Sequence, residues 1–545
     1  MTGVDPKPKA KVEGIEPAVA PLVSGLLLGA SFRWPGLSWL AWVAFFPLAV
    51  VIRTETRRAE LYAGAFIGGT AFHFLALDFL RTDSSGMMKS VWVIASYGLA
   101  PFIVFAVWGA RSLTRSWGLP QSVALPAAWV VMEFLRRRSV GALIGFDFPF
   151  LEVGTTQIER TALVQIADLF GVPGVTWLVI ACSGALGDAF STSRPSGHGL
   201  LRQLAVPAGL GVFPVLAAYG YGLWRLAESD GRPGPTVALA SASLLNRPRQ
   251  EVVDLILAEA ERASGMPDLV VGPEGQCGQV AVLAAPSSQA LAGDHGGDPA
   301  LSRFSDIARD LGAGLLIGGV RAPPDGRKYN SFFYLKRDGS YAGAYDKHHL
   351  VPGLEFQPSL LRGIIPWTTM NVRSSVTAAS RMNDPGTGFP VFRLRPRGGG
   401  ESFLFACSLC SDLYFPGLYS AYFEQARLGR APEFFAHGGD ESYYQGLTRE
   451  SWTNMRFRAI ESRRPFARQS DEGYSAIVDG SGRVVGGVIG PGEARDVLIG
   501  TVPLDGRNSV YVAGGKAFPL VLTVAFGLSL LRPVGLWLRG LSVGR

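Results

Sequence analysis

The sequence predicts a layered α/β domain set between helical segments that cross a membrane. The first observation is composition: 48% of the 545 residues are hydrophobic and only 17% are charged, with a mean hydropathy of +0.22. This composition is more apolar than that of a typical soluble globular protein. The second observation is order, because apolar runs fill the chain up to about residue 230, a polar stretch follows, and one more apolar run comes near the end. The length allows more than one domain.

The apolar segments reach or approach the roughly 20 residues that one membrane-spanning helix needs. We predict a polar tail over residues 1–16 and a helical membrane domain over 17–230 with about seven spans. A final span is expected within 511–535, before a cytoplasmic tail over 536–545. The alternative for a single short segment is a buried core helix. The expected spans lie near residues 18–30, 37–52, 61–80, 90–109, 122–135, 164–190, 204–226 and 517–531.

Arginines in the short connections predict the orientation, because such residues favour the cytoplasmic side. They follow the second, fourth, sixth and last spans, at Arg53, Arg57, Arg58, Arg111, Arg115, Arg194, Arg202, Arg532, Arg539 and Arg545. Both termini are then cytoplasmic, and the polar stretch over 231–510 lies on the outer side of the membrane. Residues 136–138, three arginines after the fifth span, break this pattern.

The polar stretch over 231–510 alternates short runs of strand-forming residues with helical periodicity, which predicts a domain of sheet and helix layers. Expected strands are 237–240, 269–271, 314–318, 332–336, 402–406, 433–436, 475–478 and 497–502. Expected helices are 250–263, 301–311 and 451–463.

Three reactive residues stand in this stretch. Glu274 and Cys410 each follow an apolar strand, and Lys347 follows a hairpin signal at Asp338-Gly339. Strand ends gather functional side chains in layered α/β folds, so the three could converge. A thiolate is a nucleophile, an ammonium favours the thiolate and stabilises an oxyanion, and a carboxylate accepts the thiol proton. This set suits acyl transfer through a thioester that an amine then attacks.

Other interpretations of these residues stay open. Cys410 alone could be a small buried hydrophobic residue. Cys407 and Cys410 also form a Cys-x-x-Cys pair, which could bind zinc or cycle as a disulfide. Zinc would need further ligands, for which the candidates are Cys182, Cys277, His348, His349 and His437. A Ser-His-Asp site is poorly supported, because no Gly-x-Ser-x-Gly motif occurs. No basic patch interleaved with aromatic residues indicates nucleic acid as a partner.

The segments around the three residues resemble the nitrilase superfamily and, more narrowly, the apolipoprotein N-acyltransferase family. The most specific segment is Tyr-Asp-Lys-His-His-Leu-Val-Pro over 345–352, with Glu355 just after it. Pro273-Glu274, Cys410 with Pro416, and a run of matching residues over 455–475 fit the same pattern. The layout of several spans, an outer domain and a last span is similar too, so the resemblance covers nearly the whole chain.

The resemblance implies a nitrilase-like α-β-β-α sandwich inserted in a membrane domain of about eight transmembrane helices. It makes Glu274 the general base, Lys347 the group that stabilises the oxyanion, and Cys410 the nucleophile. Glu355 and Asp412 would support the site.

The implied reaction moves a fatty acyl chain from a phospholipid, through a cysteine thioester, to the α-amine of the diacylglyceryl-cysteine of an apolipoprotein. The implied protein is a multi-pass, monomeric protein of the bacterial inner membrane, with its catalytic domain facing the periplasm. The resemblance implies no metal and no organic cofactor.

Several positions depart from the family pattern. Ser411-Asp412 stands where the family usually has Tyr-Glu, residues 439–444 differ from its Asn-Asp-Ala-Trp-Phe-Gly, and the first strand lacks its usual Gln-Gly-Asn. Aromatic residues near these positions are candidates for substrate contact: Tyr414, Phe415, Tyr443 and Tyr444. An exposed apolar loop beside the site would favour acyl transfer, and residues 414–422 and 360–367 are candidates for it; the alternative for their aromatic residues is ordinary core. The alternatives are a membrane-tethered amidase or hydrolase that uses water, and an inactive relative that binds lipoproteins.

Overall fold

The computed structural model describes residues 16–531 apart from eleven internal gaps. These gaps are residues 54–56, 83–85, 193–199, 229–230, 264, 277–278, 281–298, 357, 359–382, 427–430 and 443–444. The predicted tails up to residue 15 and over 536–545, the candidate loop over 360–367, Cys277, Tyr443 and Tyr444 therefore lie outside the described residues.

Helices occupy every position at which the sequence predicts a span. They are α1 (Val19–Arg33), η1 to α3 (Pro35–Arg53), α4 (Arg58–Ala76), α5 (Gly86–Gly98) with α6 (Ala100–Trp117), α7 (Gln121–Ile144), α9 (Ala167–Thr192), α10 (Leu200–Ala227) and α17 (Phe518–Ser529). Shorter helical segments between them are η2 (Asp78–Thr82), η3 (Val153–Gln157), α8 (Thr161–Val164), α16 (Val510–Ala513) and η10 (Gly515–Ala517). We call these segments, together with residues 145–152 between α7 and η3, the helical domain.

Four of these segments are long and apolar enough to cross a membrane, judged within the described part of the chain. They are Pro35–Arg53, Met88–Trp117, Ala167–Phe190 and Ala205–Ala227. α1 and α17 are apolar but have only 15 and 12 residues. These four helices are candidate spans, and the total of about eight stays a prediction.

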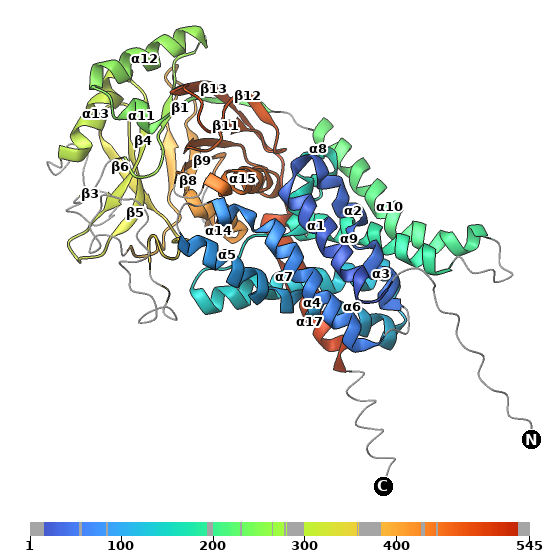
Figure 1. The fold of residues 1–545 in the computed structure, drawn as a ribbon. Coiled ribbons are helices and arrows are strands. Elements are labelled where there is room, and N and C mark those ends of the chain that lie inside the picture. The colour runs from blue at the N-terminus through green and yellow to red at the C-terminus, as the bar shows by residue number, and fades with distance from the viewer. Residues whose placement is uncertain are drawn as a thin grey trace, which may run out of the picture.

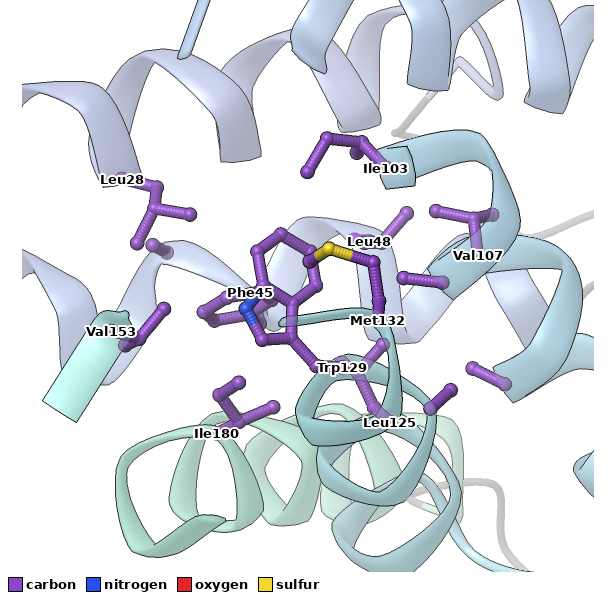
Figure 2. Close-up of a cluster of buried hydrophobic side chains, with 14 of the residues drawn as sticks. Leu28, Phe45, Leu48, Ile103, Val107, Leu125, Trp129, Met132, Val153 and Ile180 are labelled. Carbon is purple, nitrogen blue, oxygen red and sulfur yellow. The ribbon is translucent and has the colours of Figure 1, made fainter. Parts of the chain in front are cut away.

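The helical domain has a core of its own, shown in Figure 2 around Trp129 of α7. The Trp129 ring packs edge-on against Phe45, with 4.6 Å between the ring centroids. Leu28, Ile103 and Ile180 approach from other helices (Figure 2). Segments distant in sequence thus share one buried cluster, which fixes α7 among its neighbours.

The polar stretch folds into two sheets. The first has the order β13-β1-β2-β4-β5-β6, with β3 beside β4, and the second has the order β12-β11-β10-β9-β8-β7. The first sheet contains β1 (Arg232–Ala240), β2 (Leu269–Val271), β3 (Gln279–Val280), β4 (Gly314–Arg321), β5 (Tyr329–Leu335), β6 (Tyr341–Asp346) and β13 (Val497–Leu504). The second contains β7 (Val391–Leu394), β8 (Phe403–Leu409), β9 (Phe434–Asp440), β10 (Phe466–Asp471), β11 (Ser475–Val478) and β12 (Val484–Ile489).

Each sheet has a parallel centre, β1-β2-β4 in the first and β8-β9-β10 in the second. Parallel strands bring their carboxyl ends to the same edge of a sheet, which is where functional residues gather. Glu274 follows β2, and Cys410 follows β8. The eight predicted strands are all present, and β3, β6, β7, β10 and β12 are additional.

Helices cover both outer faces of the paired sheets (Figure 1). α11 (Ala242–Leu245), α12 (Arg249–Arg262) and α13 (Pro299–Leu311) pack on the first sheet through one apolar cluster. α14 (Pro416–Gln425) and α15 (Thr448–Ser462) pack on the second sheet. This is the expected α-β-β-α sandwich, and we call it the sandwich domain.

The α14–α15 layer lies between the second sheet and the helical domain (Figure 1). Phe457 and Ile460 of α15 are fully buried against Val164 and Val172 of the helical domain. Arg463, just after α15, donates to Asp168 of α9 at 2.6 and 2.9 Å. The junction between the domains is therefore both apolar and ionic.

Candidate active site

Lys347 lies at the centre of a buried group of charges. Its Nζ is 3.0 Å from Oε1 of Glu274 and 2.9 Å from Oε2 of Glu355, and the lysine side chain is 1% exposed. β6 ends at Asp346, so it delivers Lys347 directly from a strand end. Burial alone would lower the pKa of Lys347, but interactions with Cys410 in its ionised form and with the carboxylates of Glu274 and Glu355 outweigh it and raise the pKa well above its ordinary value. Lys347 is therefore a cation that can face a developing negative charge.

The side-chain amide of Asn330, on β5, bonds to both the Glu274 and the Glu355 carboxylate. Its Nδ2 donates to Oε1 of Glu355 at 2.6 Å and also to Oε1 of Glu274. The backbone N–H of Val351 donates to the other oxygen of Glu355 at 2.8 Å. Burial raises the pKa of Glu355, whereas Lys347 lowers it. Glu355 thus has fixed partners on both oxygens, which suits a supporting role beside Glu274.

Cys410 begins the 3₁₀ turn η7 (Cys410–Tyr414), immediately after β8. Its φ of +43° is in the left-handed region, which costs a non-glycine residue about 1–3 kcal/mol and recurs at functional sites. Loss of hydration raises the pKa of the partly exposed thiol, Glu274 raises it further, and Lys347 lowers it. The resting thiol is protonated, so the chemistry needs a base, and Glu274 interacts electrostatically with both Lys347 and Cys410.

Asp412 connects the turn that carries Cys410 to the segment that carries Lys347. Its Oδ2 accepts from the Tyr345 hydroxyl at 2.6 Å and from the Leu409 N–H at 3.1 Å. Its Oδ1 lies 3.0 Å from the His349 backbone nitrogen and 2.9 Å from the His349 Nδ1. Burial alone would raise the pKa of Asp412, but the bonds from His349 and Tyr345 lower it to about 2. This carboxylate fixes how the two segments lie beside each other.

The aromatic residues after Cys410 differ from one expectation. Of the two alternatives for residues 414–422, the exposed loop is wrong and the core is right, because Phe415 is 6% exposed and the residues that follow form helix α14, which buries Tyr419 and Tyr422. Tyr414 and Phe415 pack against Phe150 and Phe146 of the helical domain, with ring centroids 5.0 Å apart in each pair. Pro416 at the first helical position explains why a helix starts here. A role in substrate contact stays a prediction for Tyr414 and Phe415.

The other thiol of the Cys-x-x-Cys pair lies elsewhere. Cys407 is fully buried in the apolar cluster of the second sheet, whereas Cys410 is partly exposed beyond the strand end. Among the described residues, no group of three or more His, Cys, Asp or Glu side chains is arranged to hold a metal ion.

Asn330, Tyr345 and His349 bond to the candidate residues but were not themselves predicted to act in catalysis; His349 was named only as a possible zinc ligand. Tyr345 and His349 stand in the same segment as Lys347, so the Tyr-Asp-Lys-His-His string was their only signal. Asn330 had none, because it lies inside a strand with no motif around it. Its role depends on the pairing of β5 with β6, which sets Ser331 opposite Asp346.

Comparisons with known proteins agree with the two-part structure. The family model for the apolipoprotein N-acyltransferase N-terminal domain matches residues 24–185, and the model for carbon-nitrogen hydrolase matches residues 236–511. An apolipoprotein N-acyltransferase of Geobacter metallireducens is 27% identical, with 91% of each chain covered. Another, of Caulobacter vibrioides, is 29% identical, with 80% of each chain covered.

Among solved structures, Saccharomyces cerevisiae Nit3 of the nitrilase superfamily aligns with 53% of this chain and 96% of its own, at 18% identity and a TM-score of 0.34. With a family model matched over half of its residues and similar relatives over most of its length, this chain belongs to the carbon-nitrogen hydrolase family, as a divergent member that resembles the apolipoprotein N-acyltransferases.

Proposed function

We propose that this protein is a membrane N-acyltransferase that acylates lipoproteins. It takes a fatty acyl chain from a phospholipid, holds it as a thioester on Cys410, and passes it to the α-amine of the diacylglyceryl-cysteine of an apolipoprotein. The observation that carries the proposal is the Lys347–Glu274–Glu355 cluster beside Cys410. A domain with this cluster packs directly on apolar helices, which suits substrates that are anchored in lipid.

The first half-reaction forms the thioester. Glu274 accepts the Cys410 thiol proton, and the thiolate attacks the ester carbonyl of the donor. Lys347 stabilises the oxyanion of the tetrahedral intermediate, and its fixed ion pairs mean that little reorganisation is needed at that moment. The C–O bond of the ester then breaks, and the leaving alkoxide takes the proton from Glu274. A lysophospholipid departs, and the acyl group stays on sulfur.

The second half-reaction forms the amide. The acceptor amine attacks the thioester carbonyl, Glu274 takes one amine proton, and Lys347 again stabilises the oxyanion. The C–S bond breaks as the C–N bond becomes an amide. The departing thiolate regains a proton from Glu274, which restores the resting pair of carboxylate and thiol. Glu355 and Asp412 touch neither reacting atom in this scheme; they hold Lys347 and the Cys410 turn in place.

The proposal extends to the placement of the protein in the cell. We propose that residues 17–230 and 511–535 provide about eight membrane spans. The domain over 231–510 then faces the periplasm from the inner membrane of a bacterium. The protein acts as a monomer, because one chain contains the cluster and the nucleophile together.

The test is the intact mass of the purified protein after incubation with phospholipid vesicles. We expect a fatty-acyl mass increase that is released by a diacylated lipopeptide with a free α-amine, which leaves as the N-acyl product. Cys410→Ala should give no adduct, and Cys407→Ala is the matched control that keeps it. An adduct that persists in Cys410→Ala contradicts the choice of nucleophile.

The fate of the acyl group separates the remaining alternatives. If the adduct forms on Cys410 but water releases it equally fast with and without the lipopeptide, the protein is a hydrolase. If no donor gives an adduct while the chain remains folded, the protein is an inactive relative and the proposed function is wrong.

A further inference from the structure

The last residue of the turn that carries the nucleophile is hydrogen-bonded to a side chain of the helical domain. A helical turn leaves its last carbonyl groups without partners inside the turn, and arginine side chains can supply the missing donors. At the end of η7, Nη2 of Arg137 donates to the Tyr414 carbonyl at 2.9 Å. Arg137 lies on α7 of the helical domain. One hydrogen bond therefore crosses the domain junction directly into the Cys410–Tyr414 turn.

The next residue, Phe415, extends this connection. The guanidinium carbon of Arg137 lies 5.5 Å from the centroid of the Phe415 ring, within the range of a cation–π contact. The His349 ring stacks on the same Phe415, with centroids 3.8 Å apart and planes 3° from parallel. Phe415 is thus in contact with a helix of the helical domain and with the segment that carries Lys347.

His349 and Asp412 complete the path to the reacting groups. His349 bonds to Asp412 through its backbone N–H and its Nδ1, and Asp412 accepts from Tyr345 and Leu409. Tyr345 is two residues before Lys347, and Leu409 is the residue before Cys410. The contacts from Arg137 to both sides of the reactive pair are continuous.

The two neighbouring arginines, Arg136 and Arg138, bond to other groups. Arg136 donates to the carbonyls of Phe150 and Leu151 inside the helical domain. Arg138 is 64% exposed and pairs with Asp147 at 2.8 Å. Of the three consecutive arginines that break the charge pattern of the spans, Arg137 is the one that bonds to the Cys410 turn.

We infer that Arg137 is a positioning residue for the acyl-transfer reaction: it sets where the nucleophile-bearing turn lies relative to the membrane domain. Asp412 has a different role, because it fixes the position of Cys410 relative to Lys347 within the sandwich domain. A lipid donor is held by the membrane, so its ester must meet a thiol whose position depends on α7. A small soluble reagent, by contrast, can reach the thiol whatever its position relative to the membrane. This inference rests on the proposed function.

The experiment compares two reactions of Cys410 in the full-length protein. One is acyl-enzyme formation from phospholipid vesicles, followed by intact mass, and the other is alkylation by iodoacetamide, followed by the mass of the Cys410 peptide. We expect Arg137→Gln to slow acylation about 10- to 100-fold, because a displacement on the order of 1 Å costs that much. Its alkylation rate should match the wild type. Asp412→Asn should change both rates, and Arg138→Gln, the matched control, neither.

Amide hydrogen exchange of residues 410–415 is an independent measurement that needs no donor. Arg137→Gln should speed exchange in this turn and leave strand β8 unchanged, and Arg137→Lys, which keeps a donor and the charge, should restore part of the protection and part of the acylation rate. Equal losses of acylation and alkylation in Arg137→Gln, or unchanged exchange in the turn, would overturn the inference. If the wild type forms no acyl-enzyme, the proposed function fails, while exchange in the turn still decides whether Arg137 positions it.

Discussion

Lys347 and Glu355 form an ion pair at 2.9 Å in which the lysine side chain is 1% and the glutamate side chain 11% exposed. Removing such charges from water costs several kcal/mol per ion, and the attraction between them repays it only with good geometry and further hydrogen bonds. Asn330 and the Val351 N–H supply those bonds. A pair of this kind contributes little net stability, so its value here is a cation of fixed position beside Cys410.

Lys347→Ala should slow acyl-enzyme formation by about 10²–10³, the usual effect of removing one oxyanion donor. It should also destabilise the fold by about 3–5 kcal/mol, because Glu274 and Glu355 lose their buried partner. Single-turnover kinetics on the folded fraction separates the two effects. Lys336→Ala, at an exposed lysine just after β5, the strand that pairs with β6, is the control. A near-normal rate in the folded Lys347→Ala protein would mean that another group stabilises the oxyanion.

Glu355→Gln should move the alkaline limit of activity to lower pH. Lys347 must be protonated to act, and the charge on Glu355 is one of the contributions that raise its pKa. Removing that charge lowers the pKa of Lys347, so the protonated fraction begins to fall at lower pH than in the wild type. The pH dependence of acyl-enzyme formation measures this. Glu355→Asp keeps the charge and should retain more of the wild-type limit; identical alkaline limits in Glu355→Gln and wild type would contradict the coupling.

Asp412 should stabilise the fold at neutral pH and lose that effect in acid. Its pKa is about 2 in the folded protein, below the ordinary value of 3.8. The stabilisation is therefore fully present above about pH 4 and is lost as the pH falls towards 2, with a size on the order of 2 kcal/mol. Thermal unfolding should give a lower Tm for Asp412→Asn at pH 7, with the difference shrinking in acid. Asp254→Asn, on the exposed face of α12, should match the wild type throughout; a Tm difference for Asp412→Asn that does not depend on pH would refute the assignment.

Gly438→Ala, a substitution close to the nucleophile, should lower the free energy of unfolding. Gly438 pairs with Leu409 in the parallel β8–β9 ladder, and a Cβ at this position would come within 2.2 Å of the buried Phe332 ring. Overpacking of this kind costs about 1–3 kcal/mol. Gly417→Ala is the control of opposite sign, because a Cβ there meets nothing within 4 Å, and alanine in a helix gains about 0.5–1 kcal/mol over glycine. Equal Tm values for the two variants would show that the sheets can move apart at this point.

Much of the fold could be predicted because its signals are local. Each predicted strand has a short apolar run, and the helix predicted over 451–463 corresponds to α15, which ends one residue earlier at Ser462. β10 was missed because Arg468, Gln469 and Ser470 read as polar residues, whereas all three are buried. Arg468 is buried beside Glu441, to which it donates, and that partner is 27 residues away in sequence. A polar strand of this kind depends on a distant contact that no local pattern contains.

The site shows the same division. Glu274, Lys347 and Cys410 could be proposed from the sequence because each stands in a distinctive short string at the end of a strand. Asn330 was not found, since its two hydrogen bonds depend on the antiparallel register of β5 and β6. The aromatic run after Cys410 left two interpretations open, because its hydrophobicity suits a lipid-facing loop and a core helix equally well. Only the packing of α14 on the sheet distinguishes them.

The junction at Asp168 and Arg463 limits how this enzyme can be divided. A sandwich domain cut away from the helices would present Phe457 and Ile460 to water, next to an arginine whose two bonds to Asp168 had been lost. An exposed apolar patch of this kind promotes aggregation. We therefore expect the sandwich domain to be poorly soluble when it is expressed without the helical domain. A water-soluble version would need a redesigned outer face on α15, with polar side chains at 457 and 460 and a substitute for the carboxylate that Arg463 now binds.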